Sequence, residues 1–273
     1  MSVQIDVEKI LEAKAPSLKT KLPKFIVSYL KKIVHQDEIN EIFQTIGHLQ
    51  GLDFADALME QKFQITTQLI NEEKLPDESH VIFACNHPIG SIDGIALIQV
   101  LGRKYMNLKI PVTDFLTYIE NLNDFFIPVN KLQGRGQSRN SSTLLTKALE
   151  SDSAILFFPS GECSRRQEDG TVRDNEWKKT FIAKAKEYKR DIIPLYFEGH
   201  NSKWFLNLSY YRKKLGIKTN IEMLYLSDEM FKQKNNTFAI TVGDRIPYTT
   251  FDSSRTDKEW AEAVKQISYS LKK

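Results

Sequence analysis

Residues 80–94 of the chain, HVIFACNHPIGSIDG, decide its fold class. The run VIFAC has the length and the uninterrupted apolar character of a strand that is buried on both faces. A turn containing proline and glycine ends this run, and IDGIALIQVLGRKY at 92–105 then has the length of a buried helix. A buried strand followed at once by a buried helix is typical of α/β folds.

The same alternation extends along the chain from about residue 62. Further strands are predicted at FQITTQLI, KIPVTDFL, AILFFP, DIIPLYFEG, TNIEMLY and FAITVGD. Further helices are predicted at SRNSSTLLTKALES, NEWKKTFIAKAKEY, SKWFLNLSYYRKKLG and DKEWAEAVKQISYSLKK. We therefore predict that residues 62–273 form an α/β domain whose mixed, mostly parallel sheet is covered by helices on both faces.

Residues 1–61 are predicted to form a separate helical segment. In LPKFIVSYLKKIVHQ, the apolar residues recur at helical spacing while the lysines fall between them; they are Phe25, Ile26, Tyr29, Leu30 and Ile33, with Lys24, Lys31 and Lys32. A basic amphipathic helix of this kind suits an anionic membrane surface. The same pattern equally suits a helix whose apolar face packs on its own protein.

Composition excludes several classes of protein. Lys and Arg number 38 against 35 Asp and Glu, a net charge of +3, and no basic stripe with interleaved aromatics indicates a nucleic-acid partner. The two cysteines, Cys85 and Cys163, are too few for a disulfide scaffold and fit a reducing compartment. No secretory signal and no apolar run of about 18 residues is visible, so we expect any membrane contact to be peripheral.

The turn at 86–94, NHPIGSIDG, carries the first candidate site. His87 leaves the strand and Asp93 lies near the helix start, so the carboxylate can orient one imidazole nitrogen while the other removes a proton from a hydroxyl. Gly90 allows a tight turn that a substrate could approach closely. The competing interpretation is a turn histidine with a helix-capping aspartate.

Two further segments carry candidate binding groups. In FFPSGECSRR, at 157–166, Gly161 and Ser164 suit an oxyanion or phosphate contact, and Arg165 and Arg166 suit an anion. In NKLQGRGQSRNSS, at 130–142, Arg135 and Arg139 precede a predicted helix whose N-terminus itself favours an anion. A solvated basic loop would show the same composition.

Taken in order, these segments resemble the blocks of the glycerolipid acyltransferase superfamily, the lysophosphatidic-acid (PlsC-like) type. NHPIGSID, FFIPVN with GRGQSRN, FPSGECSRR and IIPLYFEG correspond to its four blocks, over about residues 80–200. The resemblance implies an O-acyltransferase in which His87 is the general base and Asp93 orients it. It further implies that a second group of residues binds the substrate, namely Asn86, Gly90, Ser91, Arg135, Arg139, Pro159, Ser160, Gly161, Glu162, Ser164 and Arg165. Pro194 is implied to shape the acyl pocket.

Three departures from the family pattern bear on the acceptor. Five residues, 88–92, separate His87 from Asp93 where the family usually has four, so the turn must bulge at Gly90. Ser160 stands where the family has Glu, and Cys163 where it has Arg. Asn130 stands where a basic residue is common. The pattern resembles the branch described as hemolysin-like or lysophospholipid acyltransferases, which includes enzymes that acylate N-acylated amino-acid lipids, and such a head group would account for the altered third block.

The resemblance also implies the reactants and the location. The acyl donor is an acyl carrier protein or coenzyme A thioester, the acceptor is a lyso-lipid, and no metal or tightly bound cofactor is expected. A peripheral position on the cytoplasmic face of the inner membrane follows from the lipid acceptor. Two alternatives remain: a lipid hydrolase that uses Ser91 or Ser164, although neither lies in a G-x-S-x-G elbow, and a non-catalytic membrane-surface binding protein.

Overall fold

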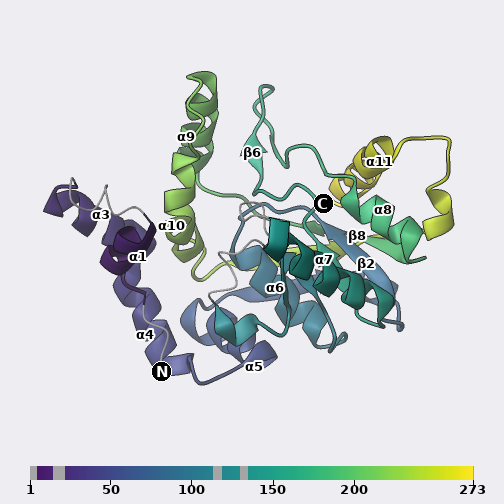
Figure 1. The fold of residues 1–273 in the computed structure, drawn as a ribbon, viewed down its shortest axis with the longest axis horizontal. Helices are drawn as coiled ribbons and strands as arrows, with labels where there is room; N and C mark the ends of the chain where they lie inside the picture. Colours follow the sequence, from purple (N-terminus) through teal and green to yellow (C-terminus); the bar gives the residue numbers. More distant parts are fainter. Residues whose placement is uncertain (1–4, 15–21, 113–118, 130–134, 273) are drawn as a thin grey trace.

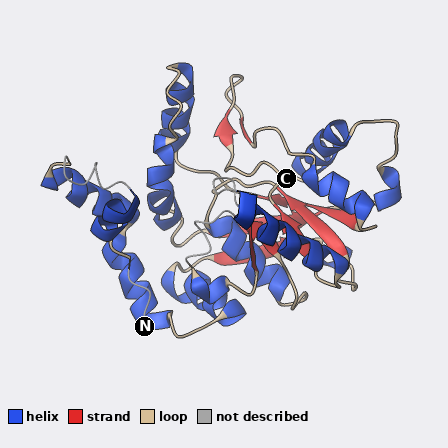
Figure 2. Cartoon of the chain, in the orientation of Figure 1, coloured by secondary structure: helices blue, strands red, loops and turns tan. Residues whose placement is uncertain are grey.

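The fold is built on a five-stranded sheet in the order β1-β9-β8-β2-β5. The computed structural model describes residues 5–14, 22–112, 119–129 and 135–272, and the side chains of 13–14 and 135–142 are not described. Strand β2 runs parallel to both β8 and β5, and β1 runs parallel to β9, whereas β8 and β9 are antiparallel. The predicted mixed, mostly parallel sheet is therefore confirmed, and Figure 2 shows it enclosed by helices.

The strands and helices follow the predicted alternation closely. The strands are β1 (Thr66–Ile70), β2 (Val81–Cys85), β3 (Ile110–Val112), β4 (Phe126–Pro128), β5 (Ile155–Phe157), β6 (Arg165–Arg166), β7 (Val172–Arg173), β8 (Asp191–Phe197) and β9 (Thr237–Val242). The α-helices are α1 (Val7–Lys14), α3 (Lys24–Val34), α4 (Gln36–Ile46), α5 (Gly51–Asp56), α6 (Ile92–Gly102), α7 (Arg135–Glu150), α8 (Thr180–Glu187), α9 (Lys203–Lys214), α10 (Leu226–Phe231) and α11 (Asp257–Ser270). A π-helix, η1 (Ala57–Lys62), follows α5, and the 3₁₀-helices are η2 (Glu72–Lys74), η4 (Glu120–Leu122), η5 (Ile221–Tyr225) and η6 (Tyr248–Thr250).

Alternate side chains of β2 enter two different hydrophobic clusters. Val81, Phe83 and Cys85 pack with side chains of α4, α5 and α6. Ile82 and Ala84 pack with side chains of α7, α8 and α11. Successive side chains of a strand point to opposite faces of its sheet, so helices cover both faces. All five residues of β2 are buried, which explains why the strand is continuously apolar instead of alternating.

The N-terminal helices are only partly separate from the rest of the protein. Ile42, Phe43 and Ile46 of α4, together with Phe54 of α5, belong to the same hydrophobic core as β2. Helices α1 and α3 lie at the periphery (Figure 1). Within the part of the chain that the structure describes, no helix combines the length and apolar character needed to cross a bilayer. The boundary at residues 61 and 62 stays a prediction.

Two local predictions differ from the structure. TNIEMLY, predicted as a strand, forms η5, because its Glu222 is buried at 0% exposure against cationic side chains instead of facing solvent. The helix predicted from residue 175 begins only at α8, because the preceding residues form a loop that reaches back to the site.

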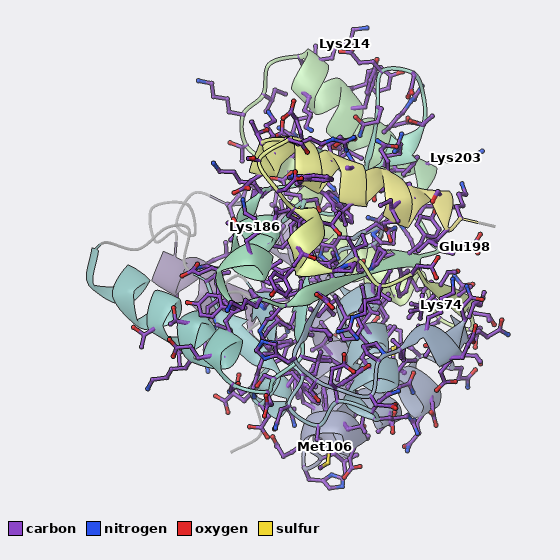
Figure 3. The ribbon with its side chains drawn as sticks, turned by 90° about the vertical axis from the view of Figure 1, so that its right-hand side faces the viewer. Lys74, Met106, Lys186, Glu198, Lys203 and Lys214 are labelled. Carbon is purple, nitrogen blue, oxygen red and sulfur yellow. The ribbon has the colours of Figure 1, made fainter. Side chains whose placement is uncertain are left out.

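Figure 1 shows α9 projecting beyond the sheet beside β6, and Figure 3 shows its Lys214 at the opposite end of the molecule from Met106.

Candidate active site

His87 and Asp93 meet where β2 ends and α6 begins. The Nδ1 atom of His87 lies 2.9 Å from Oδ2 of Asp93, an ion-pair contact whose N–H direction is not well aligned for a hydrogen bond. Such contacts in enzymes without substrate often tighten only when substrate binds. The Nε2 atom is not buried and has no hydrogen-bond partner among the described residues. The imidazole is thus oriented on one side and open on the other.

The turn between the two residues bulges at Gly90, as the spacing requires. Gly90 has φ +89°, and a Cβ there would lie 2.8 Å from Cβ of Cys163, so only glycine fits without displacement. Oδ2 of Asp93 accepts hydrogen bonds from the backbone N–H groups of Ile89 and Gly90, each at 3.1 Å. The turn therefore fixes the carboxylate that faces the imidazole.

Burial and charge together set the ionisation of the pair. Burial alone lowers the pKa of His87, but the charge of Asp93 outweighs it, so the pKa of His87 is raised above its usual 6.5. Burial alone raises the pKa of Asp93, but the His87 charge and the backbone N–H groups outweigh it, so the pKa of Asp93 is lowered. Asp93, fully buried, is thus held as a carboxylate beside an imidazole of increased basicity.

A second buried acid, Asp174, ties the first and third sequence blocks together. Its carboxylate accepts from the His87 backbone N–H at 3.2 Å, from Ser164 Oγ at 2.6 Å and from Trp177 Nε1 at 2.9 Å. The Ser164 N–H donates to the His87 carbonyl at 2.8 Å. Asp174 is missed by reasoning from the sequence, since it lies outside every block and no spacing indicates that it meets His87.

The rest of the third block also packs against the first. The ring of Phe158 stacks on the imidazole of His87, with centroids 4.1 Å apart. Cys163 is buried against Gly90, and burial raises the pKa of its thiol to about 11. A neutral, buried thiol there cannot replace the family's arginine as a cation.

The Arg165 guanidinium is buried in an internal ionic cluster. It is 2% exposed and lies 3.7 Å from Glu222, which also pairs with Arg212 at 2.7 Å. It further donates to the Cys163 carbonyl at 2.9 Å and lies over the ring of Phe205 at 5.3 Å. The structure thus places Arg165 near the site with its charge already partnered by Glu222.

Several residues predicted to bind substrate are engaged by the protein itself. The Asn86 carboxamide donates to the Phe197 carbonyl at 2.9 Å and accepts from its N–H at 2.6 Å, which joins β2 to β8. Ser160 Oγ donates to the Glu162 carbonyl at 2.6 Å.

The other residues implied by the resemblance lie in the turn between β5 and β6, in β8, or outside the described side chains. Pro159 is buried, and its carbonyl accepts from the Lys178 N–H at 3.0 Å. Gly161, with φ +64°, and Glu162 are exposed. Pro194 is buried in β8 opposite Ala84. Arg135 and Arg139 belong to α7, but their side chains lie outside the described residues.

Neither serine near the motif is arranged as a nucleophile. Ser164 Oγ donates to Asp174, not to His87. Ser91 Oγ is buried and has no hydrogen-bond partner among the described residues. A serine hydrolase needs a hydroxyl in contact with its histidine base, and the described residues do not provide one.

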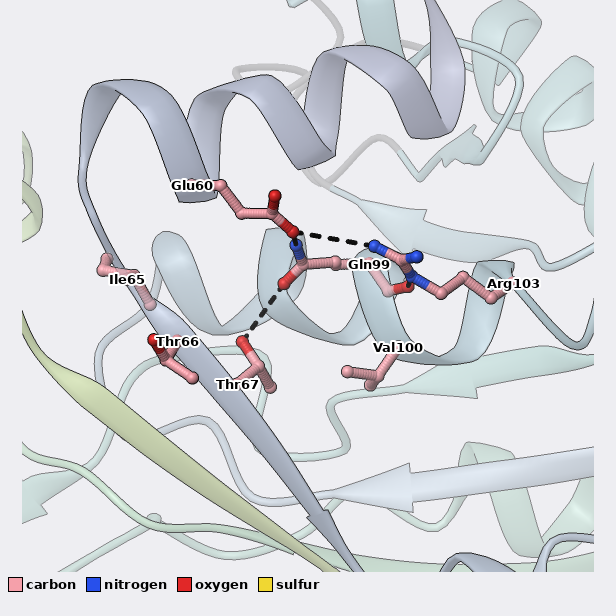
Figure 4. A pocket seen from close by; sticks show the side chains of 7 residues that line it. All are labelled: Glu60, Ile65, Thr66, Thr67, Gln99, Val100 and Arg103. Atoms are coloured by element: carbon pink, nitrogen blue, oxygen red, sulfur yellow. Dashed lines mark hydrogen bonds and ion pairs between the residues drawn. The ribbon is translucent and has the colours of Figure 1, made fainter.

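A separate pocket of about 390 Å³ lies at the other end of α6 (Figure 4). Its polar side chains satisfy one another: Gln99 donates to Glu60 at 3.0 Å and accepts from Thr67 Oγ1 at 3.2 Å. Asp93 is in the first turn of α6, so this pocket is distinct from the His87 site. No three His, Cys, Asp or Glu side chains of the described ranges lie together as a metal ion requires.

Known proteins match this chain over most of its length. The profile of the family described as Acyltransferase matches residues 9–273. The chain is 47% identical over 268 residues to a lyso-glycine lipid O-acyltransferase of Bacteroides thetaiotaomicron, covering 98% of this chain and 97% of that protein. It is 44% identical over 268 residues to a protein of the same name from Phocaeicola vulgatus, covering 98% and 95%.

The crystal structure of the 1-acyl-sn-glycerophosphate (LPA) acyltransferase from Thermotoga maritima is also similar. It has a TM-score of 0.48 and 12% identity, over 90% of this chain and 87% of that one. The family match spans nearly the whole chain, and two relatives exceed 40% identity over almost their full length. This chain therefore belongs to the acyltransferase family, within the glycerolipid acyltransferase superfamily, and is an O-acyltransferase.

Proposed function

We propose that this protein transfers a fatty acyl chain from a thioester of acyl carrier protein or coenzyme A to the free hydroxyl of a lyso-glycine lipid. The observation that carries the proposal is the buried Asp93 carboxylate 2.9 Å from an imidazole whose other nitrogen is open. The relatives named for a lyso-glycine lipid, at 44% and 47% identity, supply the acceptor class.

His87 and Asp93 suffice for direct transfer. With Nδ1 protonated toward Asp93, Nε2 takes the proton of the acceptor hydroxyl as its oxygen attacks the thioester carbonyl. The tetrahedral intermediate collapses with cleavage of the C–S bond, and the imidazolium returns the proton to the departing thiolate. No protein nucleophile is needed because the donor is already an activated acyl group, which agrees with the absence of a serine bonded to His87 among the described residues.

The third block supports an acceptor without a phosphate head group. Ser160 and Cys163 stand where the glycerolipid acyltransferase pattern has Glu and Arg. Both side chains are buried and uncharged at neutral pH. Arg165 already lies against Glu222. An acceptor with two ionisable phosphate oxygens would demand more cationic partners than a single amino-acid head group does.

The reaction and the acceptor can be tested together by mass spectrometry of lipid extracts. Wild-type and His87→Gln protein are incubated with acyl-carrier-protein or coenzyme A thioesters and a panel containing lyso-glycine lipid and lysophosphatidic acid. We expect a diacylated product from lyso-glycine lipid with the wild type alone. Preferred acylation of lysophosphatidic acid would contradict the acceptor, and free fatty acid formed without acceptor would favour the hydrolase.

The same proposal places the protein peripherally on the cytoplasmic face of the inner membrane, where the acceptor resides. Deleting residues 1–60 would be a poor test of membrane contact, because Ile42, Phe43 and Phe54 belong to the core of the domain. Substitutions of exposed residues leave that core intact.

A further inference from the structure

Exposed apolar side chains gather on elements that are far apart in sequence. On α3 they are Phe25 and Tyr29; on α9 and the turn after it they are Trp204, Tyr211, Leu215 and Ile217; on η5 they are Met223 and Leu224. Leu215 is 74% exposed and Phe25 is 69% exposed. We call these eight side chains the α3–α9 surface. Exposed apolar side chains that gather in one patch are typical of an interaction site.

Tyr225 joins the parts of this surface. Its hydroxyl lies 2.9 Å from the hydroxyl of Tyr29 on α3, and its ring packs edge-on against Trp204 of α9, with centroids 4.4 Å apart. Helices α3 and α9 therefore both contact η5, which lies between them.

The charges on α9 and in the turn after it are of one sign. Between Lys203 and Asn220 the chain carries five cationic residues and neither Asp nor Glu; they are Lys203, Arg212, Lys213, Lys214 and Lys218. Arg212 is buried with Glu222, whereas Lys213, Lys214 and Lys218 are exposed. Lysines interleaved with exposed Leu, Ile, Trp and Tyr match the interface of an anionic bilayer, where aromatic rings lie at the headgroup level.

Helix α9 is linked to the active site through the third block. Arg166 donates to Asn207 of α9 at 2.6 Å and lies over the ring of Tyr210 at 5.0 Å. Arg166 is in the third block, two residues after Ser164, whose N–H binds the His87 carbonyl. Helix α9 also begins shortly after β8, at the sheet edge where β2 delivers His87.

We propose that the α3–α9 surface docks on an anionic phospholipid bilayer, with α9 and the turn after it inserting beside the active site. This deepens the proposed function, on which it rests only in that the acceptor is a lipid. An acidic protein would match the lysines but not the leucine, isoleucine and phenylalanine between them. The bilayer matches both.

The test is sedimentation of the full-length protein with vesicles. Lys213→Gln/Lys214→Gln/Lys218→Gln is compared with the wild type on phosphatidylcholine–phosphatidylglycerol vesicles at low salt. Each lysine near an anionic surface contributes about fivefold to binding, so the triple variant should bind about a hundredfold more weakly. The control removes the same charge elsewhere, as Lys147→Gln/Lys186→Gln/Lys258→Gln, and should bind like the wild type. Equal loss in both variants would refute a localised surface.

The apolar contribution is tested separately. Leu215→Ser/Ile217→Ser should release the protein from the same vesicles, whereas Met106→Ser, at the opposite end of the molecule (Figure 3), should not. Unchanged vesicle binding by both α9 variants would overturn the proposal. So would retained vesicle binding accompanied by loss of self-association, or by weakened use of acyl carrier protein, since the surface would then serve a protein partner.

Failure of docking and failure of catalysis give different results. His87→Gln should bind vesicles like the wild type while losing acyl transfer. The α9 variants should retain acyl transfer to a short-chain, monomeric lyso-lipid while losing it on vesicle-bound acceptor. Loss on the monomeric acceptor too would contradict a purely membrane-docking role for α9.

Discussion

Replacing Asp93 by asparagine tests the core of the catalytic argument. The substitution keeps the size of the side chain but removes the charge that faces Nδ1 of His87 at 2.9 Å. At an effective dielectric constant of about 20, two unit charges at that distance attract by about 5 to 6 kcal/mol. The amide dipole retains part of this, so a loss of about 4 kcal/mol in stabilising the imidazolium is expected, or about 10³-fold in kcat/KM.

The pH dependence gives a second readout of the same change. The base works only when neutral, so the rate of the wild type should rise with pH through a midpoint above 6.5, because Asp93 raises the pKa of His87. In Asp93→Asn that contribution is gone while burial, which lowers the pKa, remains. The rising limb should therefore move to lower pH even as the maximal rate falls.

The assay is initial-rate acylation of lyso-glycine lipid from pH 5 to 9, with thermal melts to select a temperature at which both proteins are folded. The introduced carboxamide would place an N–H₂ group near backbone donors, so we expect the free energy of unfolding to fall by about 1 to 3 kcal/mol. Asp244→Asn, on the surface, is the matched control and should change neither quantity. A rate within tenfold of the wild type, or a midpoint that does not move, would refute the assigned role of Asp93.

Three further substitutions separate activity from stability. Gly90→Ala forces a side chain to φ +89° and toward Cys163, so unfolding free energy should fall by about 3 kcal/mol in chemical denaturation, with activity lost; near-wild-type stability would contradict the packing argument. Asp174→Asn removes an acceptor from three buried donors and should lower both Tm and kcat; an unchanged kcat would show that this acid only supports the fold. Thr256→Ala breaks the capping box with Glu259 and should cost about 1 kcal/mol without altering kcat/KM; a change in kcat/KM would indicate that α11 affects the site.

The features predictable from sequence are those fixed by short-range patterns. Strand β2 and helix α6 are predictable because continuous apolar runs of different lengths require a sheet with both faces buried. The meeting of His87 and Asp93 also follows locally, since one turn joins the two elements and Gly90 can take the necessary backbone conformation. The short turn and its place at the end of β2 together leave few possible positions for the His87 side chain relative to Asp93.

The features that escape prediction depend on long-range pairing. TNIEMLY has the length and the apolar content of a short strand, yet Glu222 is buried because Arg165 and Arg212 supply its partners, and Leu224 is exposed. A short apolar run cannot by itself distinguish that arrangement from a strand. Asp174 escapes for the same reason, because its three donors come from residues 87, 164 and 177. Ion pairs and hydrogen bonds between residues far apart in the chain leave no periodic pattern in the sequence.

Under the docking proposed above, the placement of the chemistry would let the acceptor stay in the bilayer. Strands β2 and β8 are parallel, so His87 and the chain leading to α9 leave the sheet at the same edge. The hairpin of β6 and β7 bridges the two, since Ser164 holds the His87 loop and Arg166 holds α9. With the α3–α9 surface docked as proposed, a lyso-lipid would present its hydroxyl to Nε2 while its acyl chain remains among lipids. The docking proposal therefore predicts transfer at the membrane surface, without extraction of the whole acceptor into a closed cavity.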